Sequence, residues 1–74
     1  MDYAKARSIA YALKEKMSKG SNGYGLFLID GKVHSTRDNS TLFCRWEATG
    51  KPELIGRYKR SRPVQHIISD LVAL

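Results

Sequence analysis

The stretch that decides the fold of this chain spans residues 24–31 and reads YGLFLIDG. Residues 24–29 are apolar on both alternating faces, which is typical of an interior strand that is covered on both sides. Partial cover of one face by a partner is the alternative. Asp30 and Gly31 both tolerate a positive φ, as a two-residue type I′ hairpin turn requires. The stretch therefore predicts a central strand that turns tightly into an antiparallel neighbour.

The residues downstream of this turn predict further strands. Residues 32–36 read KVHST, which is short and polar as an edge strand should be. Residues 41–48 alternate in polarity and predict another strand, and residues 53–59 predict a last one after a Gly-Lys-Pro turn. The last two strands would form a hairpin, which brings Arg45 and Trp46 close to the final strand.

Both ends of the chain carry the period of an amphipathic helix. Residues 2–19 place apolar side chains at the i, i+3, i+4 and i+7 spacing of a core-facing stripe. Asp2 is suited to cap the start of this helix, and Gly20 is suited to follow its end. Pro63 fits the first turn of a second helix, and residues 64–74 carry a second apolar stripe. Because a helix of about three turns is marginal alone, this segment must pack against the rest of the domain.

These elements predict an α+β fold in a single compact domain over residues 1–74. The order is an N-terminal helix, an antiparallel sheet of three to four strands and a C-terminal helix, or α-β-β-β-(β)-α, with both helices on one face of the sheet. The other face would be exposed and would suit nucleic-acid bases or a partner protein. It would carry apolar and basic side chains from the set Phe27, Ile29, Phe43, Ile55, Arg45, Arg57 and Lys59.

Composition restricts the classes of partner. The 74 residues include 13 basic and 7 acidic side chains, and the formal net charge of +6 favours nucleic acid or an acidic protein surface. An ordinary solvated surface with a basic bias is the alternative. The single cysteine, Cys44, excludes an internal disulfide, and the lack of a signal-peptide pattern predicts a reducing cytoplasm. No apolar run approaches the roughly 18–20 residues of a membrane span, so we expect no membrane partner.

The densest cationic stretch spans residues 57–62 and reads RYKRSR, directly before Pro63. Guanidinium and ammonium groups supply charge for a phosphate, and the free N–H groups of a helix start point the same way. Ser61 would add a hydroxyl donor or cap the helix, and Trp46 would either pack in the core or stack on a base. A solvated basic corner is the alternative. The candidate nucleic-acid or partner-binding residues are Arg57, Lys59, Arg60, Ser61, Arg62, Arg45, Trp46 and Tyr58.

The sequence shows no pattern of catalytic residues. His34 and His66 are far apart and lack metal-ligand spacing, and a single cysteine adds no second thiol. An arrangement of Cys44 with His34 and Asp38 has no sequence signature behind it. The chain also lacks a P-loop and a dinucleotide fingerprint. We therefore expect no enzyme activity, no metal and no cofactor.

The α-β-β-β-α order with a basic stretch before the last helix resembles the double-stranded RNA-binding domain. In that family, a lysine-rich helix start contacts phosphates across the major groove of the duplex, and residues 59–62 occupy a comparable place here. The chain departs from the family because Val64, Ile67 and Ile68 replace its alanines and Pro63 stands where its helix continues. The first helix also lacks the family's polar recognition residues. The resemblance therefore assigns no residue a role.

Together these patterns predict a small basic nucleic-acid-binding or regulatory protein that acts by stoichiometric binding to DNA or RNA. Neutralising roughly five or six phosphates would make its affinity fall steeply with salt. The alternative is an inhibitor or modulator of phage or plasmid type, of the anti-CRISPR or host-takeover class, that binds a protein or ribonucleoprotein target. A homodimer is a further option, because a second copy would help so short a chain bury its two-sided strand.

Overall fold

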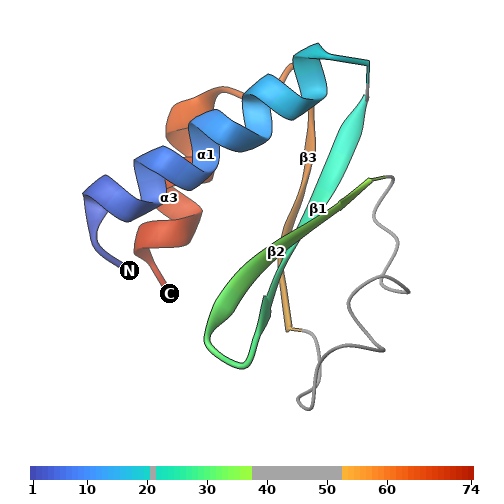
Figure 1. Cartoon of the computed structure of the whole chain (residues 1–74). Coiled ribbons are helices and arrows are strands. Elements are labelled where there is room, and N and C mark those ends of the chain that lie inside the picture. The colour runs from blue at the N-terminus through green and yellow to red at the C-terminus, as the bar shows by residue number, and fades with distance from the viewer. Residues whose placement is uncertain (21, 38–52) are drawn as a thin grey trace.

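The computed structural model describes residues 1–20, 22–37 and 53–74. It has the predicted α+β layout of an N-terminal helix, a three-stranded antiparallel sheet and a C-terminal helix (Figure 1). The elements in chain order are α1 (Tyr3–Ser18), β1 (Gly23–Ile29), β2 (Lys32–Arg37), β3 (Glu53–Lys59) and α3 (Val64–Val72).

The central place of β1 in the sheet confirms what its two-sided apolar pattern predicts. The strand order is β2-β1-β3, and β1 pairs antiparallel with both neighbours. The hairpin into β2 turns at Asp30 and Gly31, whose φ angles of 51° and 78° are both positive, as the predicted turn type needs. Within the described sheet β2 is an edge strand, which also matches its short, polar sequence.

The strand β3 pairs with β1, a pairing that the sequence analysis does not predict. The predicted strand at 53–59 is present, and it pairs with β1. Its predicted hairpin partner, residues 41–48, lies outside the described part of the chain. The β1–β3 ladder is irregular, because Leu26 lies opposite Gly56 while the next residue, Phe27, lies opposite Leu54. Ile55 is therefore the extra residue of a β-bulge, which bends the strand and increases its twist.

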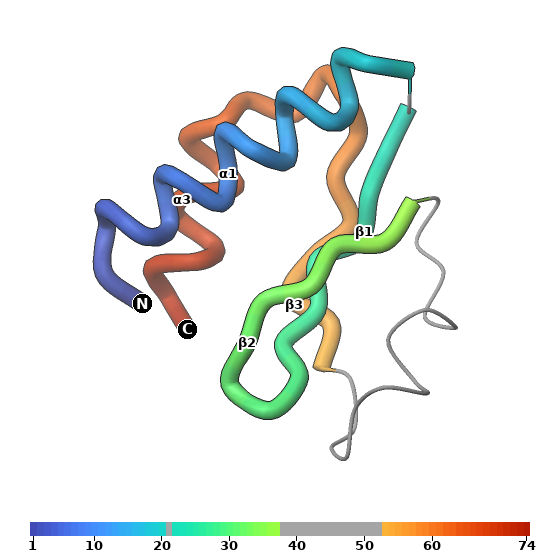
Figure 2. The backbone as a smooth tube through the Cα atoms, in the orientation of Figure 1, coloured from blue at the N-terminus to red at the C-terminus, as the bar shows by residue number. Residues whose placement is uncertain are grey.

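The two helices lie together on one side of the sheet, as predicted (Figure 1). Ala6 and Ala10 of α1 are fully buried together with Ile67 and Leu71 of α3. Small alanine side chains allow the two helix backbones to approach each other closely. The tube view shows the two chain ends side by side beneath this helix pair (Figure 2). There the Met1 ammonium donates to the Leu71 carbonyl at 3.3 Å, at the negative end of the α3 dipole.

The ends of α1 follow the predicted chemistry, whereas the start of α3 does not. The Asp2 carboxylate accepts a hydrogen bond from the Lys5 backbone N–H at 2.8 Å, and Gly20 follows the helix with a φ of 124°. In α3, Pro63 occupies the N-cap position itself, one residue before the first turn, and no side chain caps the helix. Ser61 therefore does not act as a cap.

The expected exposure of the second sheet face is wrong for Phe27 and Ile29. Both side chains are only 2 % exposed and form a small apolar cluster separate from the helix-side core. Ile55 packs against the helix-side core instead, since the bulge changes its place in the ladder. Phe27 and Ile29 are buried because β1 is a central strand with two apolar faces. Such a strand is stable only when both faces are covered.

Candidate functional site: a basic end of the molecule

The corner between β3 and α3 is held by backbone hydrogen bonds. The Arg62 N–H donates to the Lys59 carbonyl at 2.9 Å and closes a turn directly after the strand. The Arg60 N–H donates to the Asn22 carbonyl at 3.0 Å, and one guanidinium nitrogen of Arg60 lies 3.4 Å from the Asn22 side-chain oxygen. The corner is thus tied to the chain that enters the central strand.

A lysine of the first helix also holds this corner. The Lys14 ammonium donates to the carbonyl of Arg60 and, at 2.7 Å, to the carbonyl of Arg62. Two carbonyl oxygens of a highly cationic turn therefore receive a cation from a different element. In the sequence, only the place of Lys14 on the flank of the buried α1 stripe hints at this contact.

The two cations of β3 lie on the sheet face that points away from the helices. Arg57 pairs with Gly25 and Lys59 pairs with Gly23, and both side chains are exposed. Tyr58, between them, points toward the helices because side chains alternate along a strand. The strand therefore separates its two charged side chains from the aromatic one.

Tyr58 is a core residue with a polar contact. Its side chain is 3 % exposed, and its phenol donates to the Asp70 Oδ2 of α3 at 2.6 Å. Burial raises the pKa of the Tyr58 phenol far above its usual range, and the hydrogen bond and charge of Asp70 add to this, with Arg62 opposing in part. Tyr58 therefore joins β3 to α3 and does not present its ring to a partner.

Gly56 makes room for the Tyr58 ring. A Cβ atom at this position would lie 2.5 Å from the Tyr58 hydroxyl oxygen and 2.7 Å from its Cζ, closer than real contacts allow. Sequence reasoning missed this role. The available signal is a glycine inside a strand pattern, which often marks the close approach of another group.

The structure gathers cations from four segments at one end of the molecule. The corner contacts the last turns of α1 through Lys14, and β2 ends beside Tyr24, whose other neighbour is Tyr58. Figure 1 shows the end of α1, the start of β1 and the corner at the same end of the fold. We call this region the basic end and define it as Lys14, Lys19, Arg37, Arg57, Lys59, Arg60 and Arg62.

Acidic side chains among the described residues lie mostly elsewhere. Asp2 caps the start of α1, Asp30 lies in the hairpin turn, and Glu53 begins β3, so all three are distant along their elements from the corner. Glu15 is the acid nearest the end of α1, and its carboxylate lies 3.3 Å from the Lys19 ammonium. Asp70 bonds to Tyr58. Among the described residues, the charge is therefore polarised along the sheet.

Most of the predicted site residues lie in or beside the basic end. Arg57, Lys59, Arg60 and Arg62 belong to it, and Ser61 is exposed in the same corner. Arg45 and Trp46 lie outside the described residues. Across residues 1–20, 22–37 and 53–74, no group of three His, Cys, Asp or Glu side chains is placed to bind a metal ion. Over the same ranges, no helix has the length and apolar character needed to cross a bilayer.

Comparisons with known proteins add no family to this description. No protein-family model matches the chain, and searches of curated proteins and of solved structures give no significant match. The likeness to the double-stranded RNA-binding domain therefore remains one of element order.

Proposed function

We propose that this protein binds nucleic acid through the phosphates of its backbone and that the basic end is the contact surface. The observation that carries the proposal is the convergence of cations from α1, β2, β3 and the corner, with most of the described acids at the other end. Arginine and lysine side chains contact phosphate oxygens and fix the orientation of a nucleic acid without reading its sequence. The protein would act by stoichiometric binding, as a regulator.

The fixed corner favours binding over a merely solvated surface. Ordering long cationic side chains costs conformational entropy, and this cost falls when the backbone that carries them is already held. Here the corner is held by the Asn22 carbonyl and the Lys14 ammonium before any ligand arrives. The start of α3, whose N-cap makes no side-chain hydrogen bond, adds the positive end of a helix dipole.

A fluorescence-anisotropy titration of labelled duplex DNA, duplex RNA and single strands tests the proposal. The informative variant is Lys59→Ala with Arg62→Ala, because both side chains are exposed and neither makes a side-chain hydrogen bond with another described residue. The matched control is Lys5→Ala with Lys32→Ala, which removes the same charge away from the basic end.

The two double variants separate local contact from general charge. We expect the Lys59 and Arg62 variant to weaken binding by about 10- to 100-fold, as the loss of two phosphate contacts implies, and the control to change it about twofold at most. Equal weakening by both variants would show that the loss of affinity comes from the lower net charge and not from lost phosphate contacts. Binding that is undetectable for the wild type at about 0.15 M salt would refute the proposal.

A second candidate function is favoured by the exposed face of α1. Tyr3 and Tyr11 are 54 % and 46 % exposed, and the Arg7 guanidinium carbon lies 4.8 Å from the centre of the Tyr11 ring. Residues 3, 7 and 11 recur every four positions and share one helix face. Tyrosine and arginine are among the residues most enriched at the energetic centre of protein interfaces. This face supports the hypothesis of an inhibitor or modulator that binds a protein target.

The two candidate functions respond differently to nuclease. Under the second hypothesis, the immobilised protein should retain one stoichiometric partner from a nuclease-treated lysate, and Tyr3→Ser with Tyr11→Ser should release it. The Lys59 and Arg62 variant serves as the control, since it alters the other surface. Loss of every partner after nuclease treatment would contradict the second hypothesis, and nucleic-acid binding would be the remaining candidate function.

A further inference from the structure

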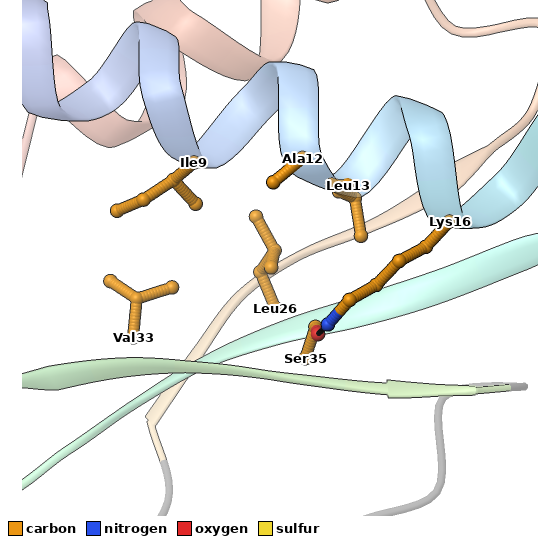
Figure 3. Close-up of a pocket in the computed structure, with 7 residues that line it drawn as sticks. All are labelled: Ile9, Ala12, Leu13, Lys16, Leu26, Val33 and Ser35. Carbon is orange, nitrogen blue, oxygen red and sulfur yellow. Dashed lines mark hydrogen bonds between the residues drawn. The ribbon is translucent and has the colours of Figure 1, made fainter.

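A groove lies between α1 and the sheet, separate from the basic corner. It has a volume of about 160 Å³ and opens to solvent on one side. The close-up shows helix side chains that point down toward β1 and β2, and strand side chains that point up toward the helix (Figure 3). The lining residues are Ile9, Ala12, Leu13 and Lys16 of α1, Leu26 of β1, and Val33 and Ser35 of β2.

The groove lies at the edge of the helix layer, between α1 and the edge strand β2. The second helix packs against α1 and β3, so it lies on the far side of α1 from the edge strand. Two of the lining side chains are also short, Ala12 on the helix and Ser35 on the strand, and they leave space that larger residues would fill. The most deeply buried lining residues are Leu13 and Leu26, which are 2 % and 1 % exposed.

One end of this apolar groove carries the cation of Lys16. The Lys16 side chain reaches from α1 to β2 at this end, and its ammonium donates to the Ser35 hydroxyl at 3.2 Å (Figure 3). Among the described residues, no carboxylate lies within ion-pair distance of this ammonium, whereas Lys19 on the same helix has Glu15. The Ser35 hydroxyl, which accepts from Lys16, retains its own proton to donate.

Size and charge together define the chemistry of a ligand. An apolar cavity of about 150 Å³ is large enough to hold a benzene ring. An ammonium and a hydroxyl at the rim fit the two oxygens of a carboxylate, and such charge-assisted hydrogen bonds are stronger than neutral ones. We propose that the groove binds a small aromatic carboxylic acid, with its ring between Ile9, Leu26 and Val33 and its carboxylate at Lys16 and Ser35.

Phenylacetate is the probe that tests this site. We expect saturable shifts of the Ile9, Leu26 and Val33 methyl signals in a methyl-selective NMR titration of the full chain. Benzyl alcohol and phenethylamine have the same ring but a neutral and a cationic head group. Both should bind at least about tenfold more weakly than phenylacetate if the ammonium contributes as a charge partner.

Two variants of α1 identify the cation. Lys16→Met keeps the aliphatic stem and should weaken phenylacetate binding about tenfold. Lys19→Met removes the same charge one turn away, outside the groove, and should leave the affinity within about twofold. Three results would each overturn the proposal: equal effects of the two variants, equal binding of the acid and the amine, or shifts of the Val64 methyls beside the basic corner instead of the groove methyls.

Discussion

At the residue scale, the contact between Gly56 and Tyr58 links the strand that carries the charges to the helix that follows. The Tyr58 ring lies against the Gly56 backbone, and its hydroxyl reaches Asp70 of α3. Neither residue belongs to the basic end, yet the pair fixes the position of β3 against the helix layer. The charged corner that follows β3 therefore depends on a glycine two positions before Tyr58.

Replacing Gly56 should destabilise the fold. We expect Gly56→Ala to lower the free energy of unfolding by about 2 kcal/mol, because the new methyl group would overlap the buried Tyr58 ring. Urea unfolding followed by circular dichroism measures this. The same substitution in a Tyr58→Leu background should cost less than half as much, since the ring it clashes with is absent. An equal cost in both backgrounds would assign the effect to glycine's backbone and not to the ring.

The Tyr58 phenol should make stability depend on pH in the alkaline range. Burial, the hydrogen bond to Asp70 and the charge of Asp70 raise the pKa of this phenol above its ordinary value of about 10. The folded state thus holds the proton more tightly than the unfolded state. The resulting stabilisation is complete below about pH 10 and is lost as the pH rises toward the folded pKa.

The variant Tyr58→Phe isolates this effect. It should cost about 1 kcal/mol at about pH 8 through the lost hydrogen bond to Asp70. Between about pH 8 and about pH 11, the wild type should then lose about 1 kcal/mol more than the variant, since only the wild type carries this proton. Lysine deprotonation affects both proteins and cancels in the difference. Parallel curves of unfolding free energy against pH would contradict the assignment.

At the element scale, local patterns predict each described element, but not all of their neighbours. Asp30 and Gly31 predict the β1–β2 hairpin because a two-residue turn fixes register locally. The pairing of β3 with β1 is different, since it joins segments far apart in the chain and has no turn to mark it. The bulge that brings Ile55 to the core is hidden for the same reason, as it depends on the partner strand.

The candidate site likewise contains residues that local sequence predicts and residues that only tertiary contacts reveal. The dense stretch at residues 57–62 is visible in the sequence because four cations fall within six residues. In the sequence, Tyr58 is a neighbour of the cations. Its side chain points into the core because side chains alternate along β3 and the helices cover one face of the sheet. Lys14 and Arg37 join the basic end through tertiary contacts and strand pairing, which sequence spacing alone does not encode.

Lys14 should matter for the shape of the corner as well as for its charge. We expect Lys14→Met to lower stability by about 1 kcal/mol and to speed backbone amide exchange at Arg60 and Arg62, because their carbonyls lose a common donor. Lys19→Met on the same helix removes an equal charge and should leave those amides protected. Unchanged exchange in the Lys14 variant would show that the corner holds its conformation without this lysine.

At the scale of the whole molecule, the separation of charge matters more than the net charge. A formal net charge of +6 attracts any polyanion, but a field concentrated at one end also orients the protein as it approaches. The short antiparallel sheet provides this separation, since each of its strands places one terminus near the corner and the other near the hairpin turn. Asp30 and Glu53 at the far end reinforce the polarity.

This polarity predicts how binding depends on salt. If about five phosphates are neutralised, affinity for duplex DNA should fall about 500-fold between about 50 mM and about 200 mM monovalent salt, because bound counterions are released. Lys59→Ala with Arg62→Ala should reduce the slope of log affinity against log salt by about two, whereas Lys5→Ala with Lys32→Ala should leave it unchanged. Anisotropy titrations at four salt concentrations give these slopes. Because general attraction would flatten both slopes equally while direct contact flattens only the first, the comparison decides whether the basic end touches the phosphates.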